Sequence, residues 1–301
     1  MIRGLIAPIL SPFHNDLSFD QWTYNDYAKH LLASGCSGLA PFGTTGEALS
    51  ISKTERQLAL DGLVKSGINP SKLIPGTGLC NLPESVELAQ QATELGCEGV
   101  MVLPPFFFKN VSDQGLLDYY ERFIERVNRT DLRIYLYHIP QVSGVGLTIS
   151  LIKTLREQYP TTIIGIKDSS GDWTNTEQLL QMEDFIVYPG SELPLVEAMR
   201  LGAPGCISAT ANLNTQQILN VISHCERHDW KQAVLAHDLA VESRHIFQEF
   251  APIPAQKALL ARMTGHDAWR NVRPPLLPMP EQKEELLRAR LDALTTEGKS
   301  D

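Results

Sequence analysis

Residues 133–168 read RIYLYHIPQVSGVGLTISLIKTLREQYPTTIIGIKD. They contain two apolar runs, at 133–140 and 162–168, with a helical pattern at 151–158 between them. Each run is continuously apolar instead of alternating apolar with polar residues. Such runs are typical of parallel strands that are covered on both faces of a sheet. The stretch therefore predicts one strand–helix–strand unit of an α/β protein.

The same alternation of strand-like runs and helical patterns extends along most of the chain. Further strand-like runs lie at residues 4–10, 38–43, 72–78, 99–105, 185–191 and 204–210, and further helical patterns lie at residues 20–34, 53–66, 83–95, 113–127, 176–182, 193–201 and 215–227. Ser52 precedes Glu55 by three residues, as in a capping box that starts a helix. Eight strand–helix units in a row predict a closed (β/α)8 TIM barrel. A doubly wound open sheet is the alternative, but it usually has fewer strands.

Strand-like runs stop after Arg227, and three helical patterns follow at residues 229–250, 253–263 and 281–294. At about 150 residues per domain, a chain of 301 residues would form two domains of similar size. The pattern predicts an unequal division instead. We expect a catalytic barrel at residues 1–228 and a C-terminal helical domain at residues 229–301.

Composition excludes several classes of function. Lys and Arg total 26 against 35 Asp and Glu, and a net charge of −9 argues against nucleic acid as the main partner. No apolar run reaches the roughly 18 residues of a membrane-spanning helix. Five scattered cysteines without a CxxC pair predict neither a disulfide framework nor a zinc site, and they favour the cytoplasm. His224 and His228 are one helical turn apart, but they lie away from the strand ends, so we expect no metal there.

In a TIM barrel the active site lies at the carboxyl ends of the strands. Lys167 ends the run 162–168, where partial desolvation would free its amine to attack a carbonyl. The alternative is a strand-end lysine that extends to solvent or pairs with Asp168. Tyr135 and Tyr137 face the same side of the preceding strand. The Tyr137 hydroxyl is a candidate proton relay, although a buried tyrosine with a satisfied hydroxyl fits the pattern equally well.

The segment Gly43-Thr44-Thr45-Gly46 forms a glycine-bracketed turn after the second strand-like run. Its N–H groups can hold a carboxylate or a phosphate, but an ordinary turn between a strand and a helix has the same composition. No lysine follows as in a Walker loop. The turn alone therefore does not decide between these two interpretations.

Together these segments resemble the dihydrodipicolinate synthase/N-acetylneuraminate lyase superfamily of pyruvate-dependent class I aldolases. The resemblance covers nearly the whole chain and rests on motifs in matching order: 43–47 (GTTGE), 76–78 (GTG), Tyr137-x-Ile139-Pro140, 165–168 (GIKD), Gly190-Ser191 and 205–212 (GCISATAN). It implies a TIM barrel with a C-terminal helical domain, and a homotetramer. It also implies that no separate cofactor is needed, because the lysine itself forms the covalent adduct.

The resemblance also implies a role for each site residue. Lys167 would form a Schiff base with the keto carbon of pyruvate or another 2-keto acid, and Tyr137 would exchange protons beside the imine. The N–H groups of Thr44 and Thr45 would hold the carboxylate, and the Thr45 hydroxyl would link Tyr137 to the substrate. Gly190 and Ile207 would line the pocket, and Ser169 would bind substrate hydroxyls together with Ser170 or Asp168, unless Asp168 only braces the loop.

Departures from the family pattern bear on the substrate. Dihydrodipicolinate synthases carry an arginine at the position of Val142 and a tyrosine pair where this chain has Phe106-Phe107-Phe108. Sialic acid lyases resemble the segment around Val142 better, but they usually have serine in the loop of Thr44 and Thr45. The run 167–172 (KDSSGD) is closer to the 2-keto-3-deoxy sugar acid aldolases.

We therefore expect an aldolase that acts on a small, polyhydroxylated 2-keto acid and releases pyruvate. Dihydrodipicolinate synthesis, N-acetylneuraminate cleavage and dehydration of a 2-keto-3-deoxy acid on the same scaffold remain alternatives. A non-catalytic relative that only binds such acids is disfavoured by the presence of both Lys167 and Tyr137.

Overall fold

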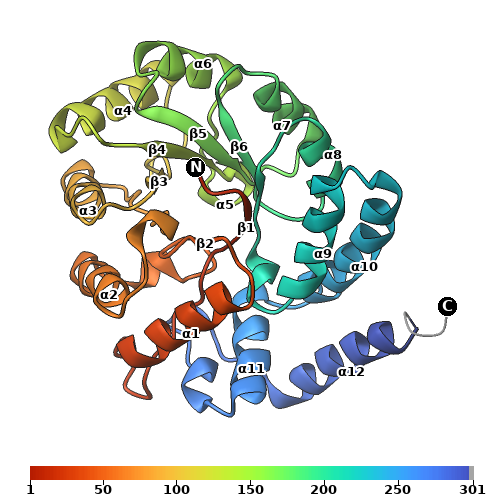
Figure 1. The fold of residues 1–301 in the computed structure, drawn as a ribbon. Helices are drawn as coiled ribbons and strands as arrows, with labels where there is room; N and C mark the ends of the chain where they lie inside the picture. Colours follow the sequence, from red (N-terminus) through yellow and green to blue (C-terminus); the bar gives the residue numbers. More distant parts are fainter. Residues whose placement is uncertain (298–301) are drawn as a thin grey trace.

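A computed structural model describes residues 1–297 and shows parallel strands surrounded by helices (Figure 1). The strands are β1 (Gly4–Ala7), β2 (Gly38–Leu39), β3 (Val100–Val102), β4 (Ile134–His138), β5 (Ile163–Asp168), β6 (Ile186–Pro189) and β7 (Gly205–Ile207). They pair in the orders β2-β1-β7 and β3-β4-β5-β6, and every pairing is parallel. β6 and β7 lie next to each other, which brings the two groups of strands together. The predicted TIM barrel is confirmed.

The prediction of a continuous strand at 72–78 is wrong. The segment forms isolated parallel bridges on both sides, from Leu73 to Leu39 and from Gly76 to Met101, without a continuous ladder. It therefore occupies the position between β2 and β3 that the barrel requires. A Cβ atom on Gly76 would meet the carbonyl oxygen of Phe42 at 2.2 Å, so this close passage depends on glycine.

Helices follow the strands around the outside of the barrel (Figure 1). They are α1 (Gln21–Ala33), α2 (Lys53–Lys65), α3 (Leu82–Glu94), α4 (Asp113–Val127), α5 (Pro140–Ser143), α6 (Ile149–Gln158), α7 (Trp173–Leu180), α8 (Leu195–Arg200) and α9 (Thr215–Glu226), with short 3-10 turns η1 (Ala48–Ser50), η2 (Pro70–Lys72) and η3 (Ala209–Asn212). The capping box of Ser52 and Glu55 is present at the start of α2. α5 was not expected, and α7 begins three residues early because Asp172 caps it.

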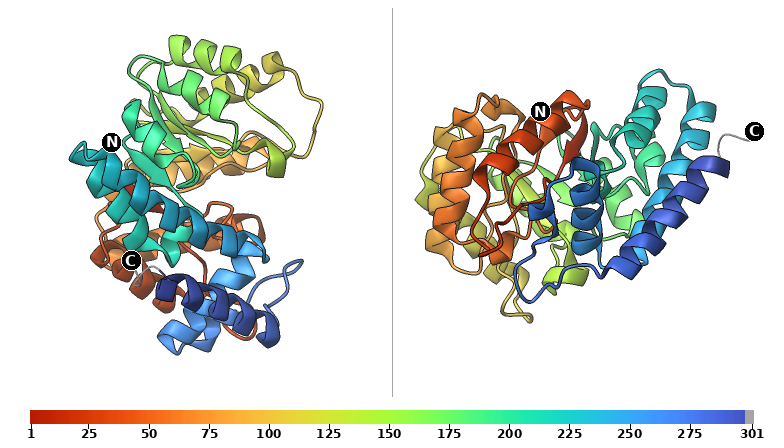
Figure 2. Two further views of the ribbon diagram at one scale, coloured as in Figure 1. Left: turned by 90° about the vertical axis from the view of Figure 1, so that its right-hand side faces the viewer. Right: turned by 90° about the horizontal axis from the view of Figure 1, so that it is seen from below.

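The remaining chain forms α10 (Trp230–Gln248), α11 (Pro252–Thr264), the 3-10 turn η4 (Asp267–Arg270) and α12 (Glu281–Glu297). α10 packs along α9 and α8, and α11 and α12 pack against α10 and against each other (Figure 2). None of the helices within the described residues is both long and apolar enough to cross a bilayer. The boundary at residue 228 stays a prediction, and residues 298–301 of the predicted C-terminal domain lie outside the described residues.

Two layers of apolar side chains fix the position of the strand ends. The larger layer fills the space between the strands and the helices. A smaller inner cluster fills the barrel itself and includes Tyr135, Tyr137 and Ile207. The prediction that Tyr135 and Tyr137 face the same side is therefore confirmed, and that side is the barrel interior.

An ion pair ties the C-terminal segment to the barrel. Arg273 donates from Nη2 and Nη1 to the two carboxylate oxygens of Glu55, at 2.5 and 2.9 Å. These hydrogen bonds from Arg273 are the main cause that lowers the pKa of Glu55 to about 2. A carboxylate with a lowered pKa stabilises the fold above its unfolded pKa and loses that contribution as the pH falls through the folded value.

Glu55→Gln is therefore expected to reduce the free energy of unfolding by about 2 kcal/mol at neutral pH. The difference from wild type should shrink as the pH falls from about 4.5 to about 2, because wild-type Glu55 becomes protonated in that window. Urea unfolding at several pH values measures this difference. A gap between the two proteins that stays constant down to pH 2 would contradict the role of the ion pair.

Candidate active site

The parallel register of β4 and β5 places Tyr137 directly opposite Lys167. Both side chains are buried, and Lys167 Nζ lies 3.4 Å from the Tyr137 hydroxyl and 4.4 Å from the centre of its ring. The ammonium group therefore lies over a ring face, which favours a cation, and within reach of a hydroxyl. Lys167 does not extend to solvent, which excludes one of the two alternatives considered for it.

Asp168 does not pair with Lys167. Its carboxylate accepts hydrogen bonds from the Ser170 N–H at 2.9 Å, from Asn175 at 3.0 Å and from the Thr176 hydroxyl at 2.7 Å. These bonds tie the end of β5 to the first turns of α7. Asp168 therefore braces the loop after the lysine and leaves the amine of Lys167 available.

Thr44 completes a chain of polar groups with this pair. Its Oγ1 lies 3.1 Å from the Tyr137 hydroxyl, which in turn lies 3.4 Å from Lys167 Nζ. The family resemblance assigned this hydroxyl link to Thr45, and the geometry corrects it to Thr44. Among the described residues, no backbone acceptor takes the N–H of Thr44 or Thr45. Both N–H groups are therefore available to a ligand oxygen.

The C-terminal segment fixes the loop that carries these threonines. Glu47 ends the loop in a left-handed conformation, with φ of 54°. Its carboxylate accepts a hydrogen bond from Lys257 of α11 at 2.6 Å and from the N–H of Arg273 at 3.1 Å. Lys257 is fully buried and also donates to the carbonyl oxygen of Ser11 at 2.8 Å. Desolvation lowers the pKa of Lys257 to about 8. This buried pair holds the loop against the barrel rim.

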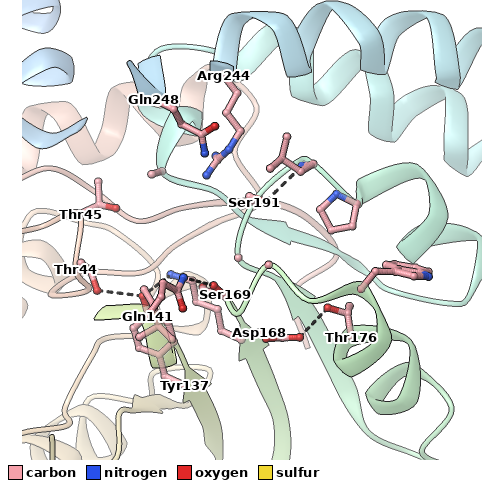
Figure 3. A pocket seen from close by; sticks show the side chains of 18 of the residues that line it. Thr44, Thr45, Tyr137, Gln141, Asp168, Ser169, Thr176, Ser191, Arg244 and Gln248 are labelled. Atoms are coloured by element: carbon pink, nitrogen blue, oxygen red, sulfur yellow. Dashed lines mark hydrogen bonds between the residues drawn. The ribbon is translucent and has the colours of Figure 1, made fainter. Parts of the chain in front are cut away.

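A cavity of about 590 Å³ opens above Lys167 (Figure 3). The side chains or backbone of Thr44, Thr45, Ser169 and Gly190 line it together with the lysine and Tyr137. Gly190 lies so close to Ser169 that a Cβ atom would meet the serine Oγ at 1.9 Å. Glycine at this position therefore keeps the wall open beside the lysine.

Two of the candidate pocket residues, Ser170 and Ile207, are not among the residues that line the cavity. Ile207 lies at the end of β7. It is fully buried in the inner barrel cluster with Tyr137, so it supports the floor of the site from below. The expectation that Ile207 contacts the pocket is corrected on this point.

Three further residues line the cavity that no sequence motif indicated. Arg244 and Gln248 enter the cavity from α10, and Glu197 enters it from α8. Figure 3 shows the side chains of Arg244 and Gln248 across the cavity from Thr44 and Tyr137. No local motif surrounds these residues, and only the packing of α10 against the barrel brings them to the site.

A second cavity of about 460 Å³ shares Thr44, Tyr137 and Ile139 with the first. It is mostly apolar and includes Phe106 and Val142 in its lining. Among the described residues that line it, Glu47 is the one charged group, and Lys257 already neutralises it.

No group of three or more His, Cys, Asp or Glu side chains in residues 1–297 is arranged to hold a metal ion. The groups described above offer an amine, two hydroxyls and two N–H groups without a backbone acceptor to a ligand in the cavity. An amine beside a hydroxyl is suited to forming an imine with a carbonyl compound and to moving the protons of that reaction.

Comparisons with known proteins match nearly the whole chain. Residues 1–294 match the model of the dihydrodipicolinate synthetase family. The chain is 32% identical to a protein of Chloroflexus aurantiacus named an uncharacterized DapA-like lyase, with 95% of each chain covered. The crystal structure of dihydrodipicolinate synthase from Agrobacterium tumefaciens is 32% identical, has a TM-score of 0.87, and covers 97% of this chain and 99% of its own.

A prophage protein of the dihydrodipicolinic acid synthase family from E. coli K12, solved in complex with pyruvate, is 26% identical. Its TM-score is 0.89, and the match covers 97% of this chain and 98% of that one. The agreement extends over the barrel and the C-terminal helices alike. The chain therefore belongs to the dihydrodipicolinate synthetase family of class I, pyruvate-dependent lyases and aldolases.

Proposed function

We propose that this protein is a Schiff-base aldolase that cleaves a 2-keto-3-deoxy acid into pyruvate and an aldehyde. The observation that supports the proposal is the row of polar groups formed by the buried Lys167 and Tyr137 and the exposed Thr44, with 3.4 and 3.1 Å between successive polar atoms. The row opens into a cavity much larger than three-carbon pyruvate requires. The related E. coli protein, solved with pyruvate, supports a 2-keto acid as the ligand.

In the proposed reaction, the amine, the tyrosine hydroxyl and the N–H groups of the threonine loop each act on a different atom of the substrate. The amine of Lys167 attacks the keto carbon, and Tyr137 donates its proton to the departing hydroxyl, so that water leaves and a protonated imine forms beside a tyrosinate. The N–H groups of Thr44 and Thr45 hold the carboxylate. Tyr137 then accepts the proton of the C4 hydroxyl while the C3–C4 bond breaks, and the electron pair moves into the imine to give an enamine. Protonation of C3 and hydrolysis of the imine release pyruvate and restore the lysine.

Dihydrodipicolinate synthesis is the second candidate, because the Agrobacterium relative carries that name. That reaction would need a cation for the second substrate's carboxylate at the position of Val142. Val142 instead lines the apolar second cavity, where no described lining residue is cationic. N-acetylneuraminate cleavage has no observation in its favour beyond the family resemblance.

The test is an assay of pyruvate release from a panel of 2-keto-3-deoxy acids, with N-acetylneuraminate included. The aldolase proposal expects pyruvate together with the matching aldehyde. Loss of the keto acid without pyruvate release would assign a dehydratase instead. Condensation of pyruvate with aspartate semialdehyde at a comparable rate would assign the synthase.

The cytoplasm remains the proposed compartment. All five cysteines lie within the described residues and none forms a disulfide, which fits a reducing environment.

A homotetramer remains the proposed assembly. Phe107 and Phe108 are each 73% exposed on the loop after β3, with their rings in edge-to-face contact at 5.3 Å. Two adjacent exposed phenylalanines are costly in water, which supports a subunit contact at this loop.

The double substitution Phe107→Ser/Phe108→Ser is therefore expected to shift the protein from a tetramer to smaller species, because it removes the apolar contact area. Size-exclusion chromatography with light scattering measures the mass. Leu58→Ser, which removes an equally exposed apolar side chain from α2, serves as the control and should leave the mass unchanged. A tetramer that survives the double substitution would place the subunit contact elsewhere.

A further inference from the structure

Arg244 has hydrogen-bonding capacity that the fold does not use. Its Nη1 donates to Glu192 Oε2 at 2.9 Å and to Ser208 Oγ at 3.3 Å. Within residues 1–297 these are the hydrogen bonds of the guanidinium, and its Nε is buried without any acceptor. A guanidinium carries five N–H donors, so Nη2 also keeps donors that no acceptor takes among the described residues.

Glu192 fixes the guanidinium in this orientation. The carboxylate is fully buried, and the hydroxyls of Ser208 and Thr210 donate to its two oxygens. Its backbone carbonyl also contacts Nε2 of His237 on α10, at 2.8 Å. Ser208, Thr210 and Arg244 thus bind the carboxylate oxygens of Glu192. The side chain of Arg244 is 15% exposed and also lines the cavity.

Arg244 lines the cavity at the end away from the threonines proposed to bind the first carboxylate. Figure 3 shows Arg244 beside Gln248, with both side chains extending from α10 across the cavity from Thr44 and Tyr137. The other charged groups on the cavity wall are already engaged, since Asp168 bonds to its own loop and Glu197 pairs with Arg200 at 3.0 Å. A guanidinium edge with two parallel donors matches the geometry of a carboxylate.

We infer that Arg244, assisted by the amide of Gln248, binds a second carboxylate at the far end of the substrate. This inference rests on the proposed imine at Lys167 and narrows the substrate class to 2-keto acids that end in a carboxylate. Glu192 balances the charge of Arg244, so recognition depends on directed donors more than on net attraction. The expected preference over a neutral terminus is accordingly about tenfold to a hundredfold, as for a charged hydrogen bond.

Borohydride trapping measures this preference without knowledge of the natural substrate. A keto acid and Lys167 lose water to form the imine, and borohydride delivers hydride to the imine carbon, which fixes the adduct for mass spectrometry. Two matched pairs serve as probes: 2-oxoglutarate with 2-oxopentanoate, and 2-oxoadipate with 2-oxohexanoate. Within each pair the chains have equal length and differ in a terminal carboxylate or methyl group.

In at least one pair, we expect half of the wild-type protein to be trapped at a concentration of the dicarboxylic acid that is at least tenfold lower than the concentration of the monocarboxylic acid that traps the same fraction. Arg244→Gln should bring that ratio close to one, and Gln248→Leu, which leaves the pair with Glu192 intact, should lower it partly. Arg290→Gln is the control. It breaks the ion pair of Arg290 with Glu249, which directly follows α10 and lies outside the cavity, so the ratio should stay unchanged. Thermal melting of each variant reports whether it is folded.

The trapping results test the role of Arg244 separately from the proposed aldolase function. No preference for the dicarboxylic acid in either pair, no adduct with any of the four longer acids, or a preference that survives in both Arg244→Gln and Gln248→Leu would overturn the role of Arg244. If Arg244→Gln fails to fold, Gln248→Leu alone decides. Pyruvate is trapped in parallel, and absence of a pyruvate adduct on wild-type protein would overturn the proposed function itself.

Discussion

Lys167→Ala is expected to abolish the borohydride-trapped pyruvate adduct and to lower kcat by more than about 10⁴-fold. The size follows from the role of the amine, because without it no imine forms and no electron sink stabilises the breaking bond. Lys167 is buried at the end of β5, against the face of the Tyr137 ring. Among the described residues, no second lysine lines the cavity and could replace it.

Lys153→Ala provides the matched control, since it removes an exposed lysine from α6 and should leave both adduct and turnover unchanged. Intact-protein mass spectrometry after borohydride treatment shows the adduct, and peptide mapping locates it. Adduct formation that persists in Lys167→Ala would assign the imine to another residue.

Tyr137→Phe is expected to lower kcat by about 10²- to 10⁴-fold, the range typical of removing a general acid–base group. The substitution keeps the ring under Lys167 Nζ and removes only the hydroxyl that lies 3.4 Å from the lysine and 3.1 Å from Thr44. Imine formation should continue at a reduced rate, because the amine and the N–H groups of the threonine loop remain. The loss should therefore appear mainly in turnover.

Single-turnover assays and borohydride trapping separate these two steps. Tyr24→Phe is the control, because the Tyr24 hydroxyl is buried without a hydrogen-bond partner and its removal should cost no activity. Turnover of Tyr137→Phe within threefold of wild type would refute the proton relay.

Much of the fold could be predicted because it depends on local patterns. Continuous apolar runs indicated buried parallel strands, and capping signals such as Ser52 and Glu55 marked helix starts within a few residues. The segment 72–78 was the exception. Its residues have the composition of a strand, but the chain passes so close to Phe42 at Gly76 that it forms isolated bridges instead of a ladder.

Lys167, Tyr137 and the loop of Thr44 and Thr45 were also predictable candidates, since each lies in or after the carboxyl end of a strand and barrel topology brings these ends together. The sequence did not indicate which threonine hydroxyl contacts Tyr137. Thr44 and Thr45 are adjacent, and only the turn geometry decides which of them reaches Tyr137. Ile207 was misplaced for a similar reason, because the end of β7 points into the inner core instead of the cavity.

Local patterns along the chain were enough to predict the barrel, the helical C-terminal segment and the candidate lysine and tyrosine, because strand and helix periodicity and residue type are local properties. Only the tertiary structure brought Arg244 and Gln248 to the cavity and Lys257 to Glu47. These contacts join positions 52 to 210 residues apart in sequence. They depend on how α10 and α11 pack against the barrel, and no periodicity within a short segment carries that information.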